Sequence, residues 1–520
     1  MLNSYYKQYC EEAEKVDKLE NKIKHLKAEN TSLKNRMDYF ESNIEAVIAK
    51  AVEAATTPLN EIIERQEIQL EAANNEISRL KAIINKDSSN SSKPPSSDGF
   101  KEVMNSREKS ERKQGGQFGH KGHRLGLPKN MEELEKTGTL ERRVEDYSNG
   151  SEPYVSRYQI DVVTKVIVTE YRFALDAQIP PELYNEVTYG DETKATMLML
   201  LNEGIVPKKR LGEIISGLTH KGVNMSPATM ESIQKEFAEK LVENKEIEAI
   251  EEDLLNSEVM NVDDSSLKTT ERIIYDPKTI DEVIGYETKE KGTYGATIRT
   301  HSNPNSTLLT VNPGKGEDGV IRDNILPRFF GIIVQDFESK FFKYGIKNAA
   351  CVAHLLRTLM GLVVLYKRDI AGEIAELFRN MNAHKEQDIQ NEIDSCDPTK
   401  LASFSAEYDE LVRRSREIIK EDPDEFGKEE LRVIIDRLET HKDKYMLFME
   451  DYQVPWTNNL AERDLRMDKT KQKVSGTFRS WTGITTHATN RSFISTVKKR
   501  GLDLVGSVRD VFKGKPVLSS

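Results

Sequence analysis

The sequence predicts an α/β core that carries an all-helical insertion and follows an N-terminal coiled coil. Three observations predict this fold class. A seven-residue repeat of apolar positions fills the first part of the 520-residue chain, short apolar segments that run into aspartates lie in the middle, and a long charged amphipathic stretch precedes the final helix. At about 150 residues per domain, this length suggests three or four folded units.

The composition excludes several classes of protein. No segment approaches the roughly 18 apolar residues that a membrane-spanning helix needs, and the N-terminus lacks the basic and apolar parts of a secretory signal. The three cysteines, Cys10, Cys351 and Cys396, form no C-x-x-C pair, so we expect neither a disulfide framework nor an ordinary structural zinc site. We therefore expect a cytoplasmic protein with no membrane partner.

Residues 1–85 predict self-association. Between Val16 and Val47, apolar side chains recur at both seam positions over five heptads, and Asn30 is the one polar residue of that seam. Pro58 interrupts the pattern, and a second run follows it. Five heptads favour a coiled coil whose register is fixed by a buried Asn30. The alternative is a pair of amphipathic helices that fold back on the protein.

Residues 86–125 form the expected linker. Serines and two prolines dominate its first half, which has almost nothing to bury and does not favour a helix. The second half combines glycines, two histidines and basic side chains that include Lys121 and Arg124. Glycines let a backbone approach phosphates and basic side chains neutralise them, so this half fits DNA contact; a flexible basic linker has the same composition.

Two further segments precede the core. Residues 126–190 predict a small module with a β-strand, because apolar and polar residues alternate between positions 155 and 173. Residues 191–250 change to a helical period, and Ser226 followed by a proline marks the start of a helix. A basic turn lies between two of these short helices. The segment therefore predicts either a helix-turn-helix DNA reader or a plain helical bundle.

The core itself is predicted in two pieces, residues 251–350 and 452–500. Short apolar segments in the first piece read as strands, and the second piece begins with the final helix. Residues 351–451 are charged and amphipathic and form the helical insertion between the two pieces. Residues 501–520 are a C-terminal tail.

Acidic residues lie where the core elements meet. One predicted strand runs straight into Asp263 and Asp264, a second ends at Asp336, and Glu462 lies near the start of the final helix. Three converging carboxylates suit hard divalent ions such as Mg²⁺, and two such ions about 3.5–4 Å apart assist an in-line phosphoryl displacement. Acids at strand ends also cap helices or face water, so spacing alone leaves both interpretations open.

The segment that follows Glu462 is basic. Between positions 463 and 500 there are ten basic residues and two acids, in a chain whose net charge is −11. A local positive excess beside three carboxylates is what a phosphodiester substrate requires. The candidates for DNA contact in this segment are Arg463, Arg466, Lys469, Lys471, Lys473 and Arg479.

Five motifs occur in order along the chain: Asn90–Gly99, Gly115–His123, Cys351–Arg357, Asn458–Arg466 and Lys471–Ser480. Together they resemble the insertion-sequence 66 family of bacterial DDE transposases, over residues 86 to about 515. The Ser-Lys-Pro-Pro-Ser-Ser block of the first motif and the Asn-Asn-x-Ala-Glu-Arg block of the fourth are long and rarely arise by chance.

The resemblance implies an RNase H-like catalytic domain, which is a mixed sheet flanked by helices with a helical insertion before the last acid. By position, Asp263, Asp336 and Glu462 match the three acids of the family. The resemblance implies that they hold Mg²⁺, for which Mn²⁺ would substitute. It also places His354 and Arg357 around the site, with Arg357 in contact with a phosphate; a buried structural histidine is the alternative for His354.

Two departures from the family pattern matter. Family members usually carry a cysteine-rich zinc module before the helical region that corresponds to residues 191–250. Residues 124–200 of this chain contain no cysteine, so no zinc is expected. Asp264 stands where the family has Glu, and Ser265 stands where it has Thr. Asp264 therefore competes with Asp263 as the first acid, although the strand alternation and the motif both favour Asp263.

The sequence and the resemblance together predict a DNA transposase. It would cut DNA at the ends of an insertion sequence and join the freed 3′-hydroxyl to target DNA, with the coiled coil pairing two subunits. The need for accessory proteins of the same element stays open. The rival interpretations are a catalytically inactive coiled-coil relative that binds DNA, and a nuclease that cuts without joining.

Overall fold

A computed structural model describes residues 2–84, 127, 130–136, 138, 140–145, 156–160, 165–421 and 426–519 of the protein. The chain divides into two compact units, Met1–Asn85 and Lys86–Ser520. The predicted linker at 86–125, with Lys121 and Arg124, lies outside the described residues.

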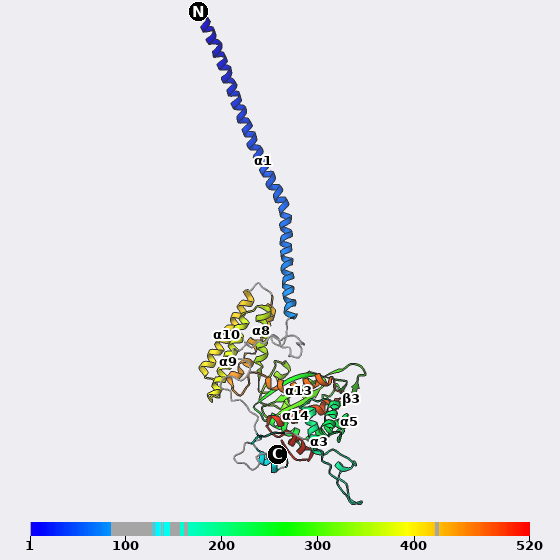
Figure 1. Ribbon diagram of the computed structural model, residues 1–520. Helices are drawn as coiled ribbons and strands as arrows, with labels where there is room; N and C mark the ends of the chain where they lie inside the picture. The colour runs from blue at the N-terminus through cyan, green and yellow to red at the C-terminus, as the bar shows by residue number, and fades with distance from the viewer. Residues whose placement is uncertain are drawn as a thin grey trace. The chain divides into compact units, whose positions relative to one another are not determined.

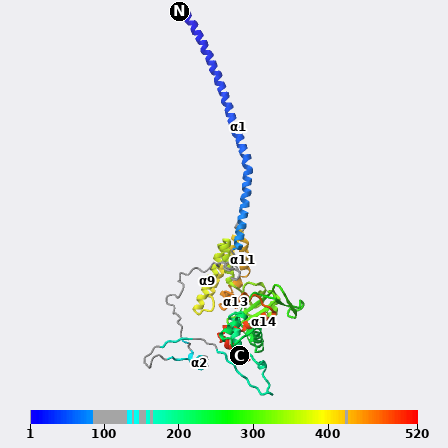
Figure 2. The same ribbon diagram turned by 45° about the vertical axis from the view of Figure 1, so that its right-hand side comes forward.

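The first unit is one long helix, α1 (Leu2–Ile84), drawn in blue in Figures 1 and 2. Its 83 residues correspond to about 125 Å of helix. The helix continues through Pro58, where the apolar pattern is interrupted, and gives up only the bond that proline cannot donate. Seam residues such as Leu26 and Leu33 are 54% and 52% exposed. The coiled coil therefore stays a prediction.

A five-stranded mixed sheet lies at the centre of the second unit, in the order β5-β4-β1-β6-β7. The central strand β1 runs antiparallel to β4 and parallel to β6, and it is the longest of the five. The outer pairs are β4 with β5, antiparallel, and β6 with β7, parallel. The strands are β1 (Val259–Thr269), β4 (Tyr294–Ser302), β5 (Thr307–Asn312), β6 (Ile332–Gln335) and β7 (Lys347–Ala350).

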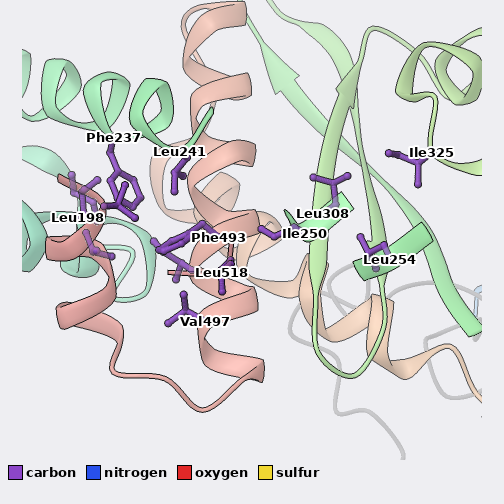
Figure 3. Packing of buried hydrophobic residues seen from close by; sticks show 14 of the residues in the cluster. Leu198, Phe237, Leu241, Ile250, Leu254, Leu308, Ile325, Phe493, Val497 and Leu518 are labelled. Carbon is purple, nitrogen blue, oxygen red and sulfur yellow. The ribbon is translucent and has the colours of Figure 1, made fainter. Parts of the chain in front are cut away.

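The larger hydrophobic core covers one face of this sheet. Alternation along β1 directs Met260 and Val262 into it. Figure 3 shows Phe493 of the C-terminal part of the chain beside Phe237 of the region predicted to be helical. The helices that line this core are α3 (Asp191–Asn202), α4 (Lys208–Leu218), α5 (Pro227–Glu243), α6 (Glu246–Leu255), α14 (Trp481–Lys499) and α15 (Leu504–Phe512).

A smaller core lies on the opposite face. Leu267 of β1 and Ile298 of β4 point into it and meet Leu465 of helix α13 (Asn459–Ser475). Helix α13 also contacts both of these strands along its length. Helix α13 is thus seated directly on the central strands, and this packing brings its first turn close to the middle of β1. The prediction that it is the final helix is wrong, because α14 and α15 follow it.

Five helices separate β7 from α13, in the interval where the sequence predicts a helical insertion. Figure 1 shows them packed on one another in yellow to orange. Phe378 and Tyr408 are buried among them, and α12 returns to contact β7. The helices are α8 (Val352–Tyr366), α9 (Ile370–Gln390), α10 (Pro398–Glu421), α11 (Lys428–Thr440) and α12 (Lys442–Glu450).

The smaller elements complete the described chain. A two-stranded hairpin follows β1, and short helices connect the larger elements. They are β2 (Glu271–Tyr275), β3 (Val283–Thr288), α2 (Met131–Lys136), α7 (Glu317–Asp323) and the 3₁₀ turns Pro181–Leu183, Leu326–Arg328 and Ser339–Lys343. Within the described part of the chain, every helix is too short or too polar to cross a membrane.

The predicted strand at 155–173 is wrong for the residues that the structure describes. Residues 156–160 and 165–173 form no strand. The described apolar members of the alternating pattern are exposed, among them Ile160 at 51% and Val168 at 88%. An alternating segment becomes a strand only when it finds a partner strand and a core to cover, and the described residues of this segment find neither.

The larger core predicts a stability difference between two phenylalanines. Phe493 is fully buried against Phe237, with ring centroids 5.7 Å apart, whereas Phe330 is 75% exposed. We expect Phe493→Ala to lower the free energy of unfolding by about 3–5 kcal/mol, because it leaves a cavity. Phe330→Ala should change it by less than about 0.5 kcal/mol. Urea unfolding of both variants followed by circular dichroism measures the difference, and equal effects would contradict the assigned packing.

Candidate active site

The three predicted acids come from three elements that meet at β1. Strands β1 and β6 are parallel neighbours with Asn261 opposite Val334, so Asp263 and Asp336 both lie two residues beyond this pair. Asp336 follows the last residue of β6, as predicted. Asp263 does not end its strand, because β1 continues to Thr269. Glu462 lies in the first turn of α13.

His354 of α8 links two of these acids. Its Nδ1 lies 3.3 Å from Asp336 Oδ1 and 3.7 Å from Glu462 Oε1. The same nitrogen lies 3.4 Å from Cys351 Sγ, and the other ring nitrogen, Nε2, lies 3.2 Å from the Arg357 guanidinium. The structure thus places His354 beside two of the acids and Arg357 beside His354.

Asn458, which the sequence analysis quotes only within a motif, holds these elements together. Its buried amide accepts a hydrogen bond from Asn261 Nδ2 at 2.9 Å and donates to Val262 O at 2.8 Å and to Asp336 Oδ1 at 3.1 Å. Asn458 is the N-cap residue of α13, but its side chain makes no capping hydrogen bond and is directed to β1 and Asp336 instead.

The neighbouring Asp264 points to the other face of the sheet. Its carboxylate accepts two hydrogen bonds from Arg299, at 2.7 and 3.1 Å, and one from Lys340 at 2.6 Å. Arg299 is its cross-strand partner on β4, and both side chains are fully buried. Arg299 also pairs with Asp323. Asp264 is therefore part of a buried ion network, and Asp263 is the aspartate that faces the other two acids.

Phe337 fixes the chain directly after Asp336. Its backbone is left-handed, with φ of 68°, which is unusual for a residue with a large side chain. Its ring stacks on Tyr445 with centroids 5.7 Å apart and meets His441 edge-on at 5.0 Å. The Arg437 guanidinium lies 4.4 Å from the ring centroid. The helical insertion therefore holds the residue that follows the second acid.

The crowded carboxylates shift the protonation of the site. Burial, and then the charge of Asp336, raise the pKa of Asp263 to about 7, against the partial opposition of Lys469. Burial lowers the pKa of His354, but hydrogen bonds to Asp336 and Cys351 outweigh this and raise the pKa to about 10. Negative charge thus accumulates here, and a cation placed among these groups would be stabilised.

The predicted DNA-contact residues of α13 and the following loop fall into two sets. Arg463, Arg466, Lys473 and Arg479 are exposed. Lys469 and Lys471 are half-buried. Burial, and then the charges of Lys471 and Arg479, lower the pKa of Lys208 to about 8. Both residues therefore lie near Lys208, which is at the start of α4. These residues therefore form a basic surface that extends from α13 to α4.

The remaining basic residues of this segment are paired with acids. Arg491 and Lys498 both contact Glu203, each at 2.5 Å. Lys499 contacts Asp464 at 2.7 Å. The positive excess counted from the sequence is therefore larger than the charge left at the surface, and α14 contributes mainly to packing.

The donor atoms of the site fit a divalent metal ion. Asp263, Asp336 and Glu462 supply the carboxylate oxygens that Mg²⁺ prefers. Glu462 Oε1 is buried and has no hydrogen-bond partner, so an acceptor is left for an ion. Among the described residues, the one group of donors within 4.8 Å of one another consists of Asp336, Cys351, His354 and Glu462. Asp263 is not a member of that group, although its carboxylate interacts electrostatically with Asp336 and Glu462.

Comparison with known proteins identifies the chain. The model described as Transposase IS66 family matches residues 186–486, which is more than half of the chain and includes all three acids. The protein is therefore a transposase. It belongs to the IS66 family. This agrees with the resemblance drawn from the motifs.

Other comparisons add less. A family of unknown function (DUF6444) matches residues 6–126. No curated protein matches the chain. Among solved structures, the chain is similar to one in the crystal structure of the Mos1 strand transfer complex, with 14% identity over 51% of this chain and 78% of that one. The TM-score of 0.11 is too low for this likeness to inform the fold.

The raised pKa of Asp263 predicts how metal-free stability depends on pH. In the folded protein the Asp263 carboxyl keeps its proton up to about pH 7, whereas in the unfolded chain it loses this proton near pH 4. The contribution of this proton to the free energy of unfolding is therefore complete below about pH 4 and is lost as the pH rises through about 7. We expect Asp263→Asn to remove this loss and to raise the free energy of unfolding at pH 8 by about 1–2 kcal/mol. Chemical unfolding in EDTA between pH 5 and 8 measures it.

Asp264→Asn is the matched contrast. It leaves the buried Arg299 without a full partner and should lower the free energy of unfolding by about 3–5 kcal/mol at both pH values. Opposite effects from two adjacent Asp→Asn changes would be difficult to explain by general damage. Destabilisation by Asp263→Asn at pH 8 would contradict the assignment of the crowded carboxylate.

Proposed function

We propose that this transposase cuts DNA strands at the ends of its element in a metal-dependent reaction and transfers the 3′-hydroxyl to target DNA. The observation that carries the proposal is the convergence of Asp336 and Glu462 on one side of β1 with Asp263, while Asp264 is directed away. Three acids from segments far apart in sequence have no evident role in folding there, since their mutual repulsion opposes it.

Asp263, Asp336 and Glu462 would hold Mg²⁺, with Mn²⁺ as a substitute. Bound at these acids, the metal would polarise the phosphate and the attacking water or hydroxyl. The chain's own residues do the rest. Asn458 keeps Asp336 in place, and His354 supplies positive charge next to two of the carboxylates. No side-chain nucleophile is required.

The basic surface supports DNA as the substrate. Arg463 and Arg466 are exposed on α13, the helix that carries Glu462, so a phosphate backbone bound there would pass close to the acids. Arg357 reaches the site from the other side through His354 and would contact a phosphate. The surface continues over Lys471 and Arg479 toward the start of α4. This part of the surface would bind DNA that flanks the cleaved phosphodiester bond.

The architecture supports an RNase H-like core for residues 251–350 and 452–500. The mixed sheet is flanked by helices on both faces, and a helical segment precedes the third acid, which is the arrangement that the resemblance implies. Residues 191–250 contribute to the same hydrophobic core, so we assign them to the catalytic unit as a helical bundle rather than to a separate reader. Helix α1 would pair two subunits and hold two element ends together.

Two rival functions make different predictions. An inactive DNA-binding relative would bind element ends without metal-dependent cutting. A nuclease would cut them without producing joined products. Glu462 Oε1 has no hydrogen-bond partner among the described residues, and the charge of Asp336 raises the pKa of Asp263. Both observations favour the active enzyme over the first rival. Detection of joined products would exclude the second rival.

Glu462→Gln tests the proposed chemistry. It keeps the shape of the side chain and removes the charge that would hold the metal, so we expect excision and joining of a plasmid-borne element to fall by more than about 100-fold, since even residues that only orient metal ligands cost 10–100-fold. Binding to the element ends should persist. Glu450→Gln, at an exposed glutamate of α12, is the control and should retain activity. Undiminished cutting by Glu462→Gln would remove it from the site.

The exposed seam of α1 tests self-association. The double variant Leu26→Asp, Leu33→Asp places two charges in the seam, and we expect the full-length protein to change from an oligomer to a monomer. The control is the double variant Ala28→Asp, Asn35→Asp, which adds the same charges on the opposite side of the helix and should leave the oligomer intact. Light scattering during size-exclusion chromatography gives the masses. A monomeric unmodified protein, or an oligomer that survives the seam changes, would refute pairing through α1.

A further inference from the structure

We propose that Cys351, His354, Asp336 and Glu462 form a binding site for a thiophilic divalent cation such as Zn²⁺, which competes with the catalytic metal. The competition rests on the proposed function, whereas the binding does not. The expectation that no zinc is bound rests on the missing cysteine-rich module and on the absence of a C-x-x-C pair. The structure places Cys351 beside three other donors instead.

The spacing of the donors is that of a tetrahedral site. Zinc bonds of about 2.0–2.3 Å place neighbouring ligands about 3.3–3.6 Å apart. From His354 Nδ1, the distances are 3.3 Å to Asp336 Oδ1, 3.4 Å to Cys351 Sγ and 3.7 Å to Glu462 Oε1. All four donor atoms lie within 4.8 Å of one another. The three distances from Nδ1 are already close to those of a tetrahedral site, and donor pairs that lie up to 4.8 Å apart would move together around an ion.

The sulfur of Cys351 is held in place beside the other donors. Its side chain is buried, and Sγ accepts a hydrogen bond from the backbone N–H of Asn458 at 3.2 Å. Cys351 is the N-cap residue of α8 and Asn458 is the N-cap residue of α13, so the starts of two helices fix the position of the sulfur.

The donor set selects against Mg²⁺ at this position. A sulfur and an imidazole nitrogen suit Zn²⁺ or Cd²⁺, whereas Mg²⁺ needs oxygen ligands and nearly octahedral geometry. The two ions would share Asp336 and Glu462, so one excludes the other. Glu462 Oε1 has no hydrogen-bond partner and is available to an ion without breaking a bond.

Binding would change the charge of the site. The ion replaces the proton on the Cys351 thiol and the proton on His354 Nδ1, and both leave to solvent. His354 keeps its other proton on Nε2, 3.2 Å from the Arg357 guanidinium. Occupation of this site removes two carboxylates and the positive charge of His354 from the proposed active site together.

Cadmium binding to the full-length protein tests the site. The chain has three cysteines, so Cys10→Ser with Cys396→Ser leaves Cys351 as its single thiol. We expect titration with Cd²⁺ to give the ultraviolet absorption of a cadmium–thiolate bond at one equivalent. Cys351→Ser should abolish it, and serine keeps a good N-cap for α8. His354→Gln should weaken binding by at least about 10-fold.

Two controls keep the result interpretable. Cys396→Ser alone removes another buried cysteine and should leave the signal intact. If the double variant does not fold, the difference between the unmodified protein and Cys351→Ser carries the same information. Absence of the absorption, or an affinity that His354→Gln does not change, would overturn the proposal, since a thiol alone would then explain any bound cadmium.

The competition is measured separately. With Mg²⁺ present, Zn²⁺ should inhibit strand cleavage at about 10-fold lower concentration in the unmodified protein than in Cys351→Ser, each compared with its own activity in Mg²⁺ alone. Equal sensitivity would refute competition at this site. Cadmium binding without any cleavage would refute the proposed function and keep the metal site, and cleavage without cadmium binding would do the reverse.

Discussion

The buried amide of Asn458 is the interaction on which the site depends. Its hydrogen bonds join β1, the end of β6 and the start of α13, which lie far apart along the chain. Because the amide is fully buried, each of these bonds replaces water that is not available there, and loss of any one would leave a polar atom unpaired. The parallel pairing of β1 and β6 sets the height of two acids, and Asn458 sets the position of the third relative to them.

The helical insertion contributes to the same geometry from outside the sheet. It begins at α8, which supplies His354, and it ends just before Asn458. Between these points, Tyr445 and Arg437 hold the ring of Phe337, the residue that follows Asp336 in a left-handed conformation. A left-handed phenylalanine costs free energy that surrounding contacts must offset. A long insertion between the second and third acids is therefore part of the structure that fixes the second acid.

Much of the site could be predicted from local patterns. The acids Asp336 and Glu462 follow from a strand end and a helix start, and the helices at 191–250 and 351–451 follow from their period. The sequence left Asp263 and Asp264 in competition, because the deciding residue, Arg299, lies on another strand. The failed strand at 155–173 had the correct alternation but lacked a partner, and the basic count after Glu462 did not include Glu203, which neutralises two members from far away. Each miss concerns a contact between distant segments.

The position of Asp263 in the interior of β1 has a consequence for how the strand finds its register. If β1 slipped by one residue so that Asp264 took the place of Asp263 beside Asp336, Ser265 would lie opposite Arg299, and this buried guanidinium would lose its carboxylate partner. The same slip would move Met260 and Val262 out of the larger core. The buried ion pair and the apolar side chains on one face of β1 therefore select the same register, and that register sets the position of Asp263 on the other face.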